Sequence, residues 1–420
     1  MPNIQRLHLF QGYGVELEYM IVDKETLNVR PLAADLLTKA IGSLEDDFIN
    51  GEITWSNELV MHVIELKSTL PVTDMVKFST HFKNNILMAN NILDEFNAML
   101  MPTAAHPWMN PQTDTVLWPY GSKEIYETYN KIFNCQGHGW SNLQSSHLNL
   151  PFYDDEEFAR LHAAVRLVLP ILPALAASSP VLEGKFSKFY DKRLSYYEKN
   201  QMRIPSITGK VIPEKLFSRR SYQKFIFDKI KTDLQKHDTL GIMDPVWVNS
   251  RGATARFDRG TIEIRLLDIQ ECPAADLAII ALVVHTLKWL VAEEGIKLHE
   301  QMEFGVEPLY KIFNATIRDA EETIINDPKF LSIFKIEKSE LKAGELWKEI
   351  HSIVKGKYPD EMVPWENYLK NIFEQGTLAR RIMNIAGNEP TLETLKLVYK
   401  ELSDCLQENE MFNSWIEDVL

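Results

Sequence analysis

The sequence predicts an α+β protein. Three observations support this fold class: strand-like and helix-like segments alternate through the first half of the 420 residues, residues 246–268 have the pattern of a hairpin, and the pattern beyond about residue 300 is mostly helical. Neither a low-complexity tract nor an internal repeat marks a boundary. We expect one α+β domain over residues 1–300 and a helical extension over residues 301–420 packed on the same domain.

The first elements follow from local periodicity. Val15, Leu17, Tyr19 and Ile21 alternate with Glu16, Glu18 and Met20, which predicts a strand with two distinct faces and both glutamates on one of them. A short helix is expected over residues 32–41. Residues 53–68 are rich in Ile, Val and Trp and predict a strand or hairpin with a turn-like Ser56-Asn57.

A long helix is expected next, because apolar residues recur at helical spacing from Val76 to Leu100 behind a capping Thr73-Asp74. Residues 101–150 are rich in Pro, Gly, Trp and Asn, which is typical of connections that line a cleft, and they close with a strand over 144–150. A helix over 154–178 should break at its two prolines, Pro170 and Pro173.

The second half begins with an irregular, basic and aromatic segment over residues 184–216, interpreted as a substrate loop or an ordinary surface loop. In the hairpin over 246–268, Asp258-Arg259-Gly260 forms the link, and Glu263, Arg265 and Leu267 share one face of the second strand. Residues 274–292 are apolar, but Asp276, His285, Lys288 and Trp289 interrupt them, so we expect a buried helix and no membrane span.

Composition narrows the range of partners and compartments. Lys and Arg number 45 against 59 Asp and Glu, a formal charge of −14, which disfavours nucleic acid and anionic membrane surfaces. The amino terminus shows neither an apolar signal region nor a cleavage pattern, so we expect no export signal. Three cysteines fit a reducing compartment, and we expect a cytoplasmic protein.

Acidic residues inside apolar strands are the strongest chemical signal. They are Glu16, Glu18, Glu58, Glu65 and Glu263. Burying ionised carboxylates without partners costs several kcal/mol each, so cations must lie among them, either arginines or divalent metals. Oxygen ligands on rigid strands suit Mg²⁺ or Mn²⁺, and His147 could add a nitrogen ligand.

Polar residues that share a strand face accompany these acids. Glu263 and Arg265 suit phosphoryl transfer, with the carboxylate on a metal and the guanidinium on the transferred group, although a surface salt bridge would have the same pattern. Ser145, His147 and Asn149 form a polar stripe. Weaker candidates are His106, which precedes a proline, Arg251 and Arg256 near the hairpin, and Arg380 and Arg381 after Gly376-Thr377.

Several ordered motifs resemble one enzyme family. They are GVELEYMIVD at 14–23, ITWSNELVMHVIELKS at 53–68, HPW at 106–108, SSHLNLPF at 145–152, ALAASSP at 174–180, TIEIRLLDIQECP at 261–273 and GTLAR at 376–380. Together they are similar to glutamate-cysteine ligase family 2, the carboxylate-amine ligases related to bacterial gamma-glutamylcysteine synthetase. The resemblance implies a catalytic domain of the glutamine synthetase and guanido kinase type, in which an antiparallel sheet forms a funnel with helices outside.

The resemblance also implies roles for individual residues, with ATP and Mg²⁺ (or Mn²⁺) as cofactors. Glu16, His147 and Glu263 would hold the metal nearest the ATP phosphates, and Glu18, Glu58 and Glu65 the metal on the amino-acid side. Arg265 would contact the phosphoryl group, with Arg251 and Arg256 as further candidates to bind ATP, and Asn149, His106 and Arg380 are the candidates for substrate binding. Glu58 and Glu65 are an odd number of residues apart, so a turn or bulge separates them or only one is a ligand.

The activity implied is ATP-dependent activation of a carboxylate, by resemblance the γ-carboxylate of glutamate, followed by amide formation with an amine such as cysteine. Three alternatives stay open: a ligase for another amine such as a peptide or polyamine, a two-metal hydrolase, and a catalytically weak regulatory relative. The partners expected are small molecules, and the sheet edge and helical tail could support a homodimer.

Overall fold

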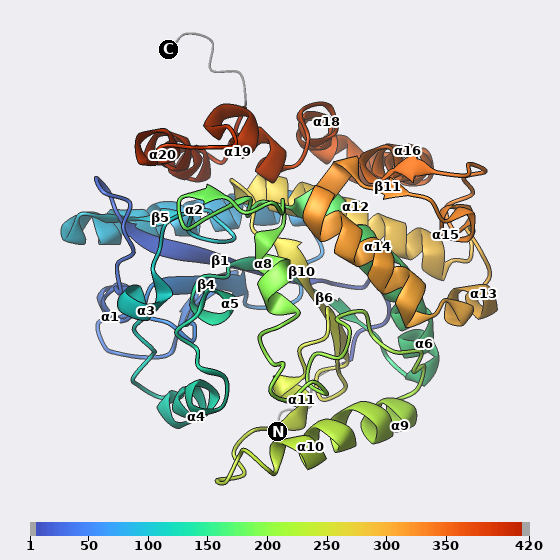
Figure 1. The fold of residues 1–420 in the computed structure, drawn as a ribbon, viewed down its shortest axis with the longest axis horizontal. Helices are drawn as coiled ribbons and strands as arrows, with labels where there is room; N and C mark the ends of the chain where they lie inside the picture. The colour runs from blue at the N-terminus through green and yellow to red at the C-terminus, as the bar shows by residue number, and fades with distance from the viewer. Residues whose placement is uncertain (1–5, 414–420) are drawn as a thin grey trace.

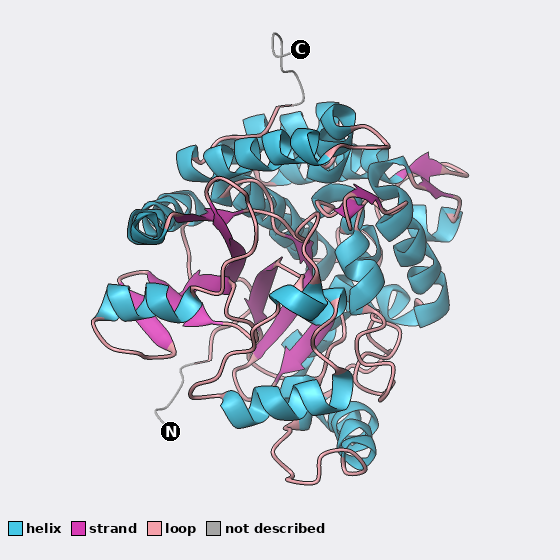
Figure 2. Cartoon of the chain, turned by 60° about the vertical axis from the view of Figure 1, so that its left-hand side comes forward, coloured by secondary structure: helices cyan, strands magenta, loops and turns pink. Residues whose placement is uncertain are grey.

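An eight-stranded sheet, antiparallel at every pairing, forms the centre of the computed structural model, which describes residues 6–413. Its strand order is β2-β3-β4-β1-β6-β10-β9, with β5 paired to the far end of β1. Helices surround the sheet (Figures 1 and 2), which confirms the α+β prediction. The first five residues of the amino-terminal stretch lie outside the described residues. The strands are β1 Gly14–Asp23, β2 Asp47–Asn50, β3 Ile53–Asn57, β4 Val63–Ser68, β5 Ala98–Met101, β6 Ser145–Pro151, β9 Ala253–Arg256 and β10 Thr261–Asp268, and two small ribbons pair β7 Val181–Leu182 with β8 Lys185–Phe186 and β11 Ile324–Ile325 with β12 Leu341–Lys342.

Strand β1 has the two faces that its alternation predicts. Val15, Leu17, Tyr19 and Ile21 are fully buried on the core side. On the other face Glu16 lies opposite His147 of β6, and Glu18 lies opposite Glu65 of β4. Residues directly opposite in an antiparallel pair share a face, so three strands contribute ionisable side chains to the same surface.

The turn between β3 and β4 lies later than expected. Ser56 and Asn57 belong to β3 and pair with Glu65 and Ile64, so the predicted turn at these two residues is wrong, and the chain reverses over 58–62. This reversal explains the odd spacing of Glu58 and Glu65. The two glutamates belong to the two arms of a hairpin and do not sit on one regular strand.

A bulge in β10 corrects the expected position of Leu267. Ile264 pairs with Leu148 and Leu267 pairs with Ser146, so two residues of β10 oppose one residue of β6. The extra residue turns Leu267 to the core side, where it is 1% exposed. Asp268 takes the place that Leu267 would have on the face of Glu263 and Arg265.

The β9–β10 hairpin is confirmed, with a shorter first strand than expected. Residues 257–260 link the strands, and Gly260 has φ of 69°, a left-handed conformation that favours glycine. Strand β9 begins only at Ala253. Residues 246–248, expected as strand, belong instead to the short helix α11 Pro245–Val248, with Pro245 in its first turn.

Helices cover the core face of the sheet. The apolar α12 packs against α2, α6, α16 and α18. Its length and composition would suit a membrane span, but 89% of its residues in the most apolar 18-residue window are buried inside the protein.

Asp74 caps α2 by accepting a hydrogen bond from the Lys77 amide at 3.0 Å. This helix ends at Leu93, and Leu100, predicted as helical, lies in β5. The first twelve helices are α1 Ala33–Ile41, α2 Met75–Leu93, α3 Pro111–Asp114, α4 Lys123–Phe133, α5 His138–Ser141, α6 Asp155–Val168, α7 Pro173–Ala176, α8 Lys192–Tyr197, α9 Arg219–Tyr222, α10 Asp228–Leu234, α11 Pro245–Val248 and α12 Pro273–Val291.

The predicted helix over 154–178 divides at its prolines into α6, a 3₁₀ turn over 169–171, and α7. The loop expected over 184–216 contains α8, which lies in front of β10 in Figure 1. Asp191 starts α8 by accepting a hydrogen bond from the Leu194 amide at 2.9 Å. This short helix therefore faces the sheet side that carries the acidic residues.

The carboxy-terminal helices form a layer along one side of the molecule (orange to red in Figure 1). Their packing is continuous with the rest, because one cluster of buried apolar residues runs from Tyr13 to Leu406. A wholly buried ion pair between Arg381 and Glu271 joins α19 to the segment that follows β10. The helices are α13 Leu298–Glu303, α14 Val306–Asp319, α15 Pro328–Ser332, α16 Ala343–Lys357, α17 Pro359–Met362, α18 Glu366–Gln375, α19 Leu378–Ala386 and α20 Leu392–Glu408.

Candidate functional site

A cavity of about 600 Å³ lies against the polar face of the sheet. Its floor comes from β1, β2, β4, β6, β9 and β10, and its walls come from α4, α5, α8 and α11. Six acidic and five basic side chains line it: Glu16, Glu18, Asp47, Glu58, Glu65 and Glu263 against Lys67, Arg193, Arg256, Arg259 and Arg265. The two signs nearly balance, so their arrangement decides what the cavity can bind.

Most of the acidic residues and the arginines lie on different strands, although Lys67 lies beside Glu65 on β4 and Glu263 beside Arg265 on β10. Glu65 on β4 and Glu16 and Glu18 on β1 occupy one side, and His147 on β6 lies next. Arg265 on β10 and Arg256 on β9 follow at the other side. A bound cation would therefore find its ligands at the β4–β1 side, while anionic groups would find guanidinium donors at the β10–β9 side.

Glu16, His147 and Glu263 form the first acidic group, with ligand atoms within 4.8 Å of one another. The Nδ1 atom of His147 lies 3.0 Å from Glu16 Oε2, and Asn149 donates to Glu16 Oε1 at 2.9 Å. Burial opposes ionisation of Glu16, but the hydrogen bond and charge of His147, helped by Arg265, lower its pKa to about 2. The same partners act on the imidazole: burial disfavours its charge, but Glu16 and Glu18 raise the pKa of His147 to about 9.

Glu18, Glu65 and His147 form the second group, again within 4.8 Å. Ser145 donates to Glu18 Oε2 from its amide at 2.7 Å and from its hydroxyl at 3.0 Å. Glu65 accepts from the Ser56 hydroxyl at 2.6 Å and lies 3.1 Å from Lys67 Nζ. Burial and the charge of Glu16 nevertheless raise the pKa of Glu65 to about 7, because Lys67 compensates only in part.

Glu58 lines the cavity but does not belong to either of these groups. Burial, then the charges of Glu65 and Glu18, raise its pKa well above the ordinary range. Among the described residues 6–413, this position of Glu58 supports the alternative in which only Glu65 of the two is a direct metal ligand.

The arginine side is built on the β9–β10 hairpin. Arg265 Nε lies 2.5 Å from Glu263 Oε1, and Arg256 lies 3.8 Å from Glu263 Oε2 while also pairing with Asp258 at 3.1 Å. Burial opposes the charge of Arg265, but Glu263 raises its pKa above the usual range. Both guanidinium groups line the cavity.

Four predicted site residues lie outside the cavity lining. Asn149 instead orients Glu16 from beside it. Arg251 is 3% exposed and binds Glu214 at 2.6 and 2.8 Å, so it serves the packing behind the hairpin. His106 is fully buried, with Nε2 2.8 Å from the Leu27 carbonyl and Nδ1 accepting from the Met109 amide at 3.0 Å. These contacts use both ring nitrogens of His106.

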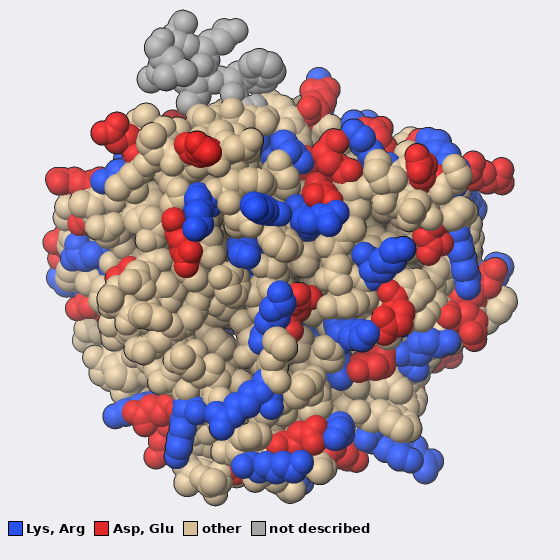
Figure 3. Space-filling model, viewed as in Figure 1, with Lys and Arg blue, Asp and Glu red and all other residues tan. Residues whose placement is uncertain are grey.

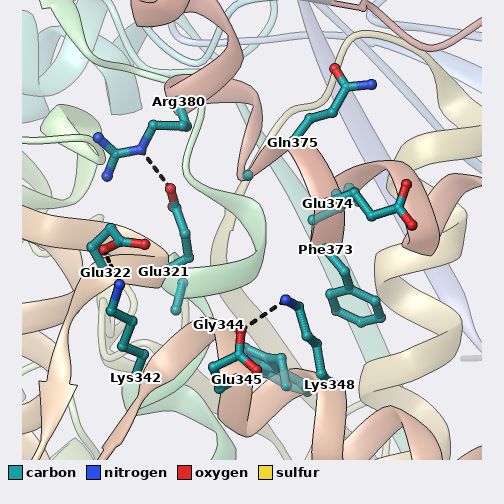
Figure 4. Close-up of a pocket in the computed structure, with 14 residues that line it drawn as sticks. Glu321, Glu322, Lys342, Gly344, Glu345, Lys348, Phe373, Glu374, Gln375 and Arg380 are labelled. Carbon is teal, nitrogen blue, oxygen red and sulfur yellow. Dashed lines mark hydrogen bonds and ion pairs between the residues drawn. The ribbon is translucent and has the colours of Figure 1, made fainter.

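Arg380 belongs to a separate pocket of about 470 Å³ between the carboxy-terminal helices. Figure 4 shows its guanidinium pointing toward Glu321, and the two groups form an ion pair at 2.6 Å. The guanidinium also stacks 3.8 Å from the Tyr190 ring. Lys342 and Lys348 in this pocket are paired as well, with Glu322 and Glu345.

Sequence reasoning missed several lining residues outside the sheet. They are Tyr126, Tyr129, Trp140, Arg193, Tyr197, Asn200 and Trp247. All of them except Trp247 lie in 101–150 or 184–216, segments that were expected to line a cleft or, as one interpretation, to bind substrate. Individual residues could not be chosen, since the position of each helix against the cavity depends on tertiary packing.

The two acidic groups fit divalent cations by their chemistry. Each offers two carboxylates and an imidazole, and His147 lies between the groups and belongs to both. Hard ions such as Mg²⁺ and Mn²⁺ prefer carboxylate oxygen and accept imidazole nitrogen. The hydrogen bonds from Ser145 and Asn149 hold the carboxylates in place, as supporting residues do in metal sites.

Comparison with known proteins finds several relatives in sequence. The chain is 31% identical over 400 residues to an uncharacterized protein of Archaeoglobus fulgidus, covering 95% of this chain and 99% of the other. It is 20% identical over 274 residues to a putative glutamate–cysteine ligase 2 of Gloeobacter violaceus, covering 64% and 66%. A shorter match, 31% over 149 residues and 35% of each chain, is to a putative glutamate–cysteine ligase 2 of Enterobacter.

Two solved structures share the fold. A bifunctional glutathione synthetase from Pasteurella multocida matches with a TM-score of 0.54 at 13% identity, over 95% of this chain and 53% of that one. This chain thus spans about half of that enzyme. The ligase PafA, crystallised with the prokaryotic ubiquitin-like protein Pup, matches with a TM-score of 0.50 at 11% identity, over 93% and 72%. The profile of glutamate-cysteine ligase family 2 matches residues 13–345, and the chain belongs to this family.

Proposed function

We propose that this protein is an ATP-dependent carboxylate-amine ligase that joins the γ-carboxylate of glutamate to the amine of an amino acid such as cysteine, with Mg²⁺ or Mn²⁺ as the metal. Family and fold support the ATP-dependent ligase class. The glutamate and cysteine assignment is supported by the relatives' names alone. The separation of charge across the sheet face carries the chemical argument.

In the proposed reaction the substrate carboxylate attacks the γ-phosphorus of ATP, the bond to the bridging oxygen breaks, and ADP leaves. The amine nitrogen then attacks the acyl carbon, the bond from carbon to the phosphate oxygen breaks, and phosphate and one proton are released. Bound divalent cations would neutralise the repelling anions in the first step.

The chain's own residues position these groups. Glu16, His147 and Glu263 would hold one cation at the centre of the strand order, and Glu18 and Glu65 would hold another nearer β4. Arg256 and Arg265 present guanidinium donors on the adjacent hairpin, where the charge of the transferred phosphoryl group develops. This adjacency favours phosphoryl transfer over metal-assisted hydrolysis, because water activation needs no guanidinium pair beside the metals.

The test is an assay of ADP release by purified protein with ATP, Mg²⁺ and glutamate against a panel of amines including cysteine. We expect ADP, phosphate and amide in equal amounts from the native protein. The matched variant Glu263→Gln keeps the side-chain volume but removes the charge that faces the metal and Arg265, and we expect its rate to fall by about 100-fold or more. ADP release equal to that of this variant for every pair would contradict the ligase. Amide hydrolysis without ATP would favour the two-metal hydrolase.

A further inference from the structure

One buried arginine, Arg166 on α6, differs from the others in its partners. Four arginines among the described residues are 3% exposed or less. Three of them form ion pairs with carboxylates: Arg193 with Asp268, Arg251 with Glu214 and Arg381 with Glu271. Arg166 is fully buried and forms no ion pair with any carboxylate in residues 6–413. A buried charge without a counter-charge is costly, so the surroundings of Arg166 require an explanation.

Neutral groups hold two of the three nitrogens of the Arg166 guanidinium. Its Nε atom donates to the Pro213 carbonyl at 2.7 Å, and its Nη2 atom donates to the Phe304 carbonyl at 2.8 Å. The ring centroid of Phe217 lies 5.8 Å from the guanidinium carbon. The Nη1 atom is buried and has no hydrogen-bond partner in the part of the chain that the structure describes. Donors are therefore left over, and the charge stays unbalanced.

The carboxylate of Glu214 acts on Arg166 from a distance but belongs to another arginine. Both of its oxygens bind Arg251, at 2.6 and 2.8 Å. Burial lowers the pKa of Arg166 to about 10, and the charge of Glu214 opposes this only in part. Arg166 is still charged at pH 7. The two arginines and one glutamate thus leave one positive charge inside the protein.

His162 lies one helical turn before Arg166 on the same face of α6. It is 1% exposed, and neither of its ring nitrogens has a hydrogen-bond partner among residues 6–413. Burial, then the charges of Arg166 and Arg251, lower the pKa of His162 to about 3, so the ring is neutral and carries one N–H donor. Its ring centroid lies 5.9 Å from that of Phe217, the same ring that Arg166 approaches. Two residues with unused donors therefore lie beside one apolar ring.

We propose that a chloride ion binds between Arg166 and His162, where it accepts hydrogen bonds from Arg166 Nη1 and from the imidazole N–H. One negative charge balances the cluster, and a spherical anion is satisfied by a few donors in an apolar setting. Sulfate or phosphate would bring more charge and more acceptor oxygens than these donors match. The inference does not depend on the proposed ligase activity.

The ion would stabilise the packing behind the β9–β10 hairpin. Arg166 holds the carbonyl of Pro213, and the next residue, Glu214, binds Arg251. Gly252, which follows Arg251, accepts a hydrogen bond from the Arg265 amide at 3.0 Å. An anion at Arg166 would therefore support the segment that lies behind the arginine side of the cavity without touching the cavity itself.

The first test is thermal unfolding of protein dialysed into sodium gluconate, with chloride replacing gluconate at constant ionic strength. We expect the Tm of native protein to rise with chloride and then to level off, by about 2 °C or more. Arg166→Met removes the charge and the donor and should abolish this rise, and His162→Phe should reduce it. Arg160→Met is the matched control on the same helix, because Arg160 is partly exposed and pairs with Glu156 and Glu293. It should keep the native response, and an equal rise in Arg166→Met would overturn the inference.

The second test locates the ion directly and needs only the native protein. Crystals soaked in sodium bromide should show an anomalous peak within about 3.5 Å of Arg166 Nη1. Such a peak would support the inference even if Arg166→Met did not fold. A water molecule at this place in the bromide crystals, or bromide found only on the outer surface, would overturn it.

Discussion

His147 contacts both acidic groups, and its surroundings show how single residues prepare the site. Its Nδ1 atom meets Glu16 and its Nε2 atom lies 2.9 Å from the Ser145 hydroxyl, which also binds Glu18. Each carboxylate oriented by such contacts loses little further freedom when a cation binds. Residues that never touch a ligand can therefore control metal affinity.

Asn149→Ala tests this control. The amide of Asn149 holds Glu16 Oε1 at 2.9 Å, so its removal should leave Glu16 less well oriented. We expect the Mg²⁺ concentration for half-maximal ADP release to rise about 10- to 100-fold. Asn326→Ala, at an exposed position outside the cavity lining, is the control and should leave the concentration unchanged. Equal Mg²⁺ requirements in both variants would remove Asn149 from the metal site.

His106 should matter for stability rather than for substrate binding. Its ring bonds the Leu27 carbonyl and the Met109 amide, so His106→Ala would leave buried backbone groups without partners. We expect a loss of about 3 kcal/mol in unfolding free energy near pH 7. Urea unfolding measures this loss.

The same variant should change the pH dependence of stability. Burial, and nearby His62, lower the pKa of His106 to about 4, from an ordinary value of 6.5. Between these values the unfolded chain binds a proton that the folded chain does not, so native stability falls as the pH falls. The gap between native protein and His106→Ala should therefore shrink by about 2 kcal/mol near pH 5. A gap of constant size would show that the imidazole is not held neutral.

At the scale of elements, the β9–β10 hairpin combines the arginine side of the cavity with the bulge that presents Asp268. Gly252 lies just before β9, and its carbonyl accepts from the Arg265 amide at 3.0 Å. A Cβ atom on Gly252 would lie 2.5 Å from Leu266 Cδ1 and 2.8 Å from its Cγ atom. Only glycine allows this approach of the backbone to the bulge.

Gly252→Ala should therefore destabilise the hairpin. Leu266 is fully buried and cannot move without disturbing its neighbours, so we expect a loss of about 1–3 kcal/mol, measured by urea unfolding. Gly356→Ala in α16 is the matched control, because its Cβ would meet nothing within 4 Å. Alanine favours helix, so this control should be neutral or stabilising by up to about 1 kcal/mol. Equal effects in both variants would contradict the close approach at Gly252.

At the scale of the whole molecule, the sheet divides two environments. Its core face packs on α12 and the surrounding helices, while its polar face and α8 enclose the cavity. The outer surface in Figure 3 shows acidic and basic side chains interspersed. The formal charge of −14 therefore does not describe the cavity, where six acidic and five basic side chains meet.

The stability of the carboxy-terminal layer should depend on one buried ion pair. Arg381 binds Glu271, and both side chains are fully buried, with the Arg381 guanidinium also bonding the Phe412 carbonyl at 2.6 Å. Arg381→Met would leave the Glu271 charge unpaired, and we expect a loss of about 3–5 kcal/mol in unfolding free energy. The double variant Arg381→Met with Glu271→Leu should recover most of this loss. If the double variant does not regain this stability, the loss comes from the changed shape of the buried side chains rather than from the unpaired charge of Glu271.

The sequence by itself determined the alternation of β1, the capped start of α2, the proline breaks after α6 and the β9–β10 hairpin, because each follows from neighbours along the chain. The acidic residues inside or beside apolar strands, Glu16, Glu18, Glu58, Glu65 and Glu263, were predicted to need cationic partners, and these five and the candidates His147, Arg256 and Arg265 all line the cavity. The place of Glu58 relative to β3 and β4 depended on where the hairpin turns. Local composition put this turn at Ser56-Asn57, whereas the chain reverses over 58–62.

Only the tertiary structure decided which polar residues reach the cavity. Arg251, His106 and Arg380 were weaker candidates in the sequence, as was Arg256, yet packing places them against Glu214, Leu27 and Glu321 while Arg256 lines the cavity. Arg193 and Asp268 meet because α8 crosses the sheet and a bulge turns β10 by one residue. Such encounters depend on register and helix placement, which are set by long-range packing and leave no local pattern in the chain.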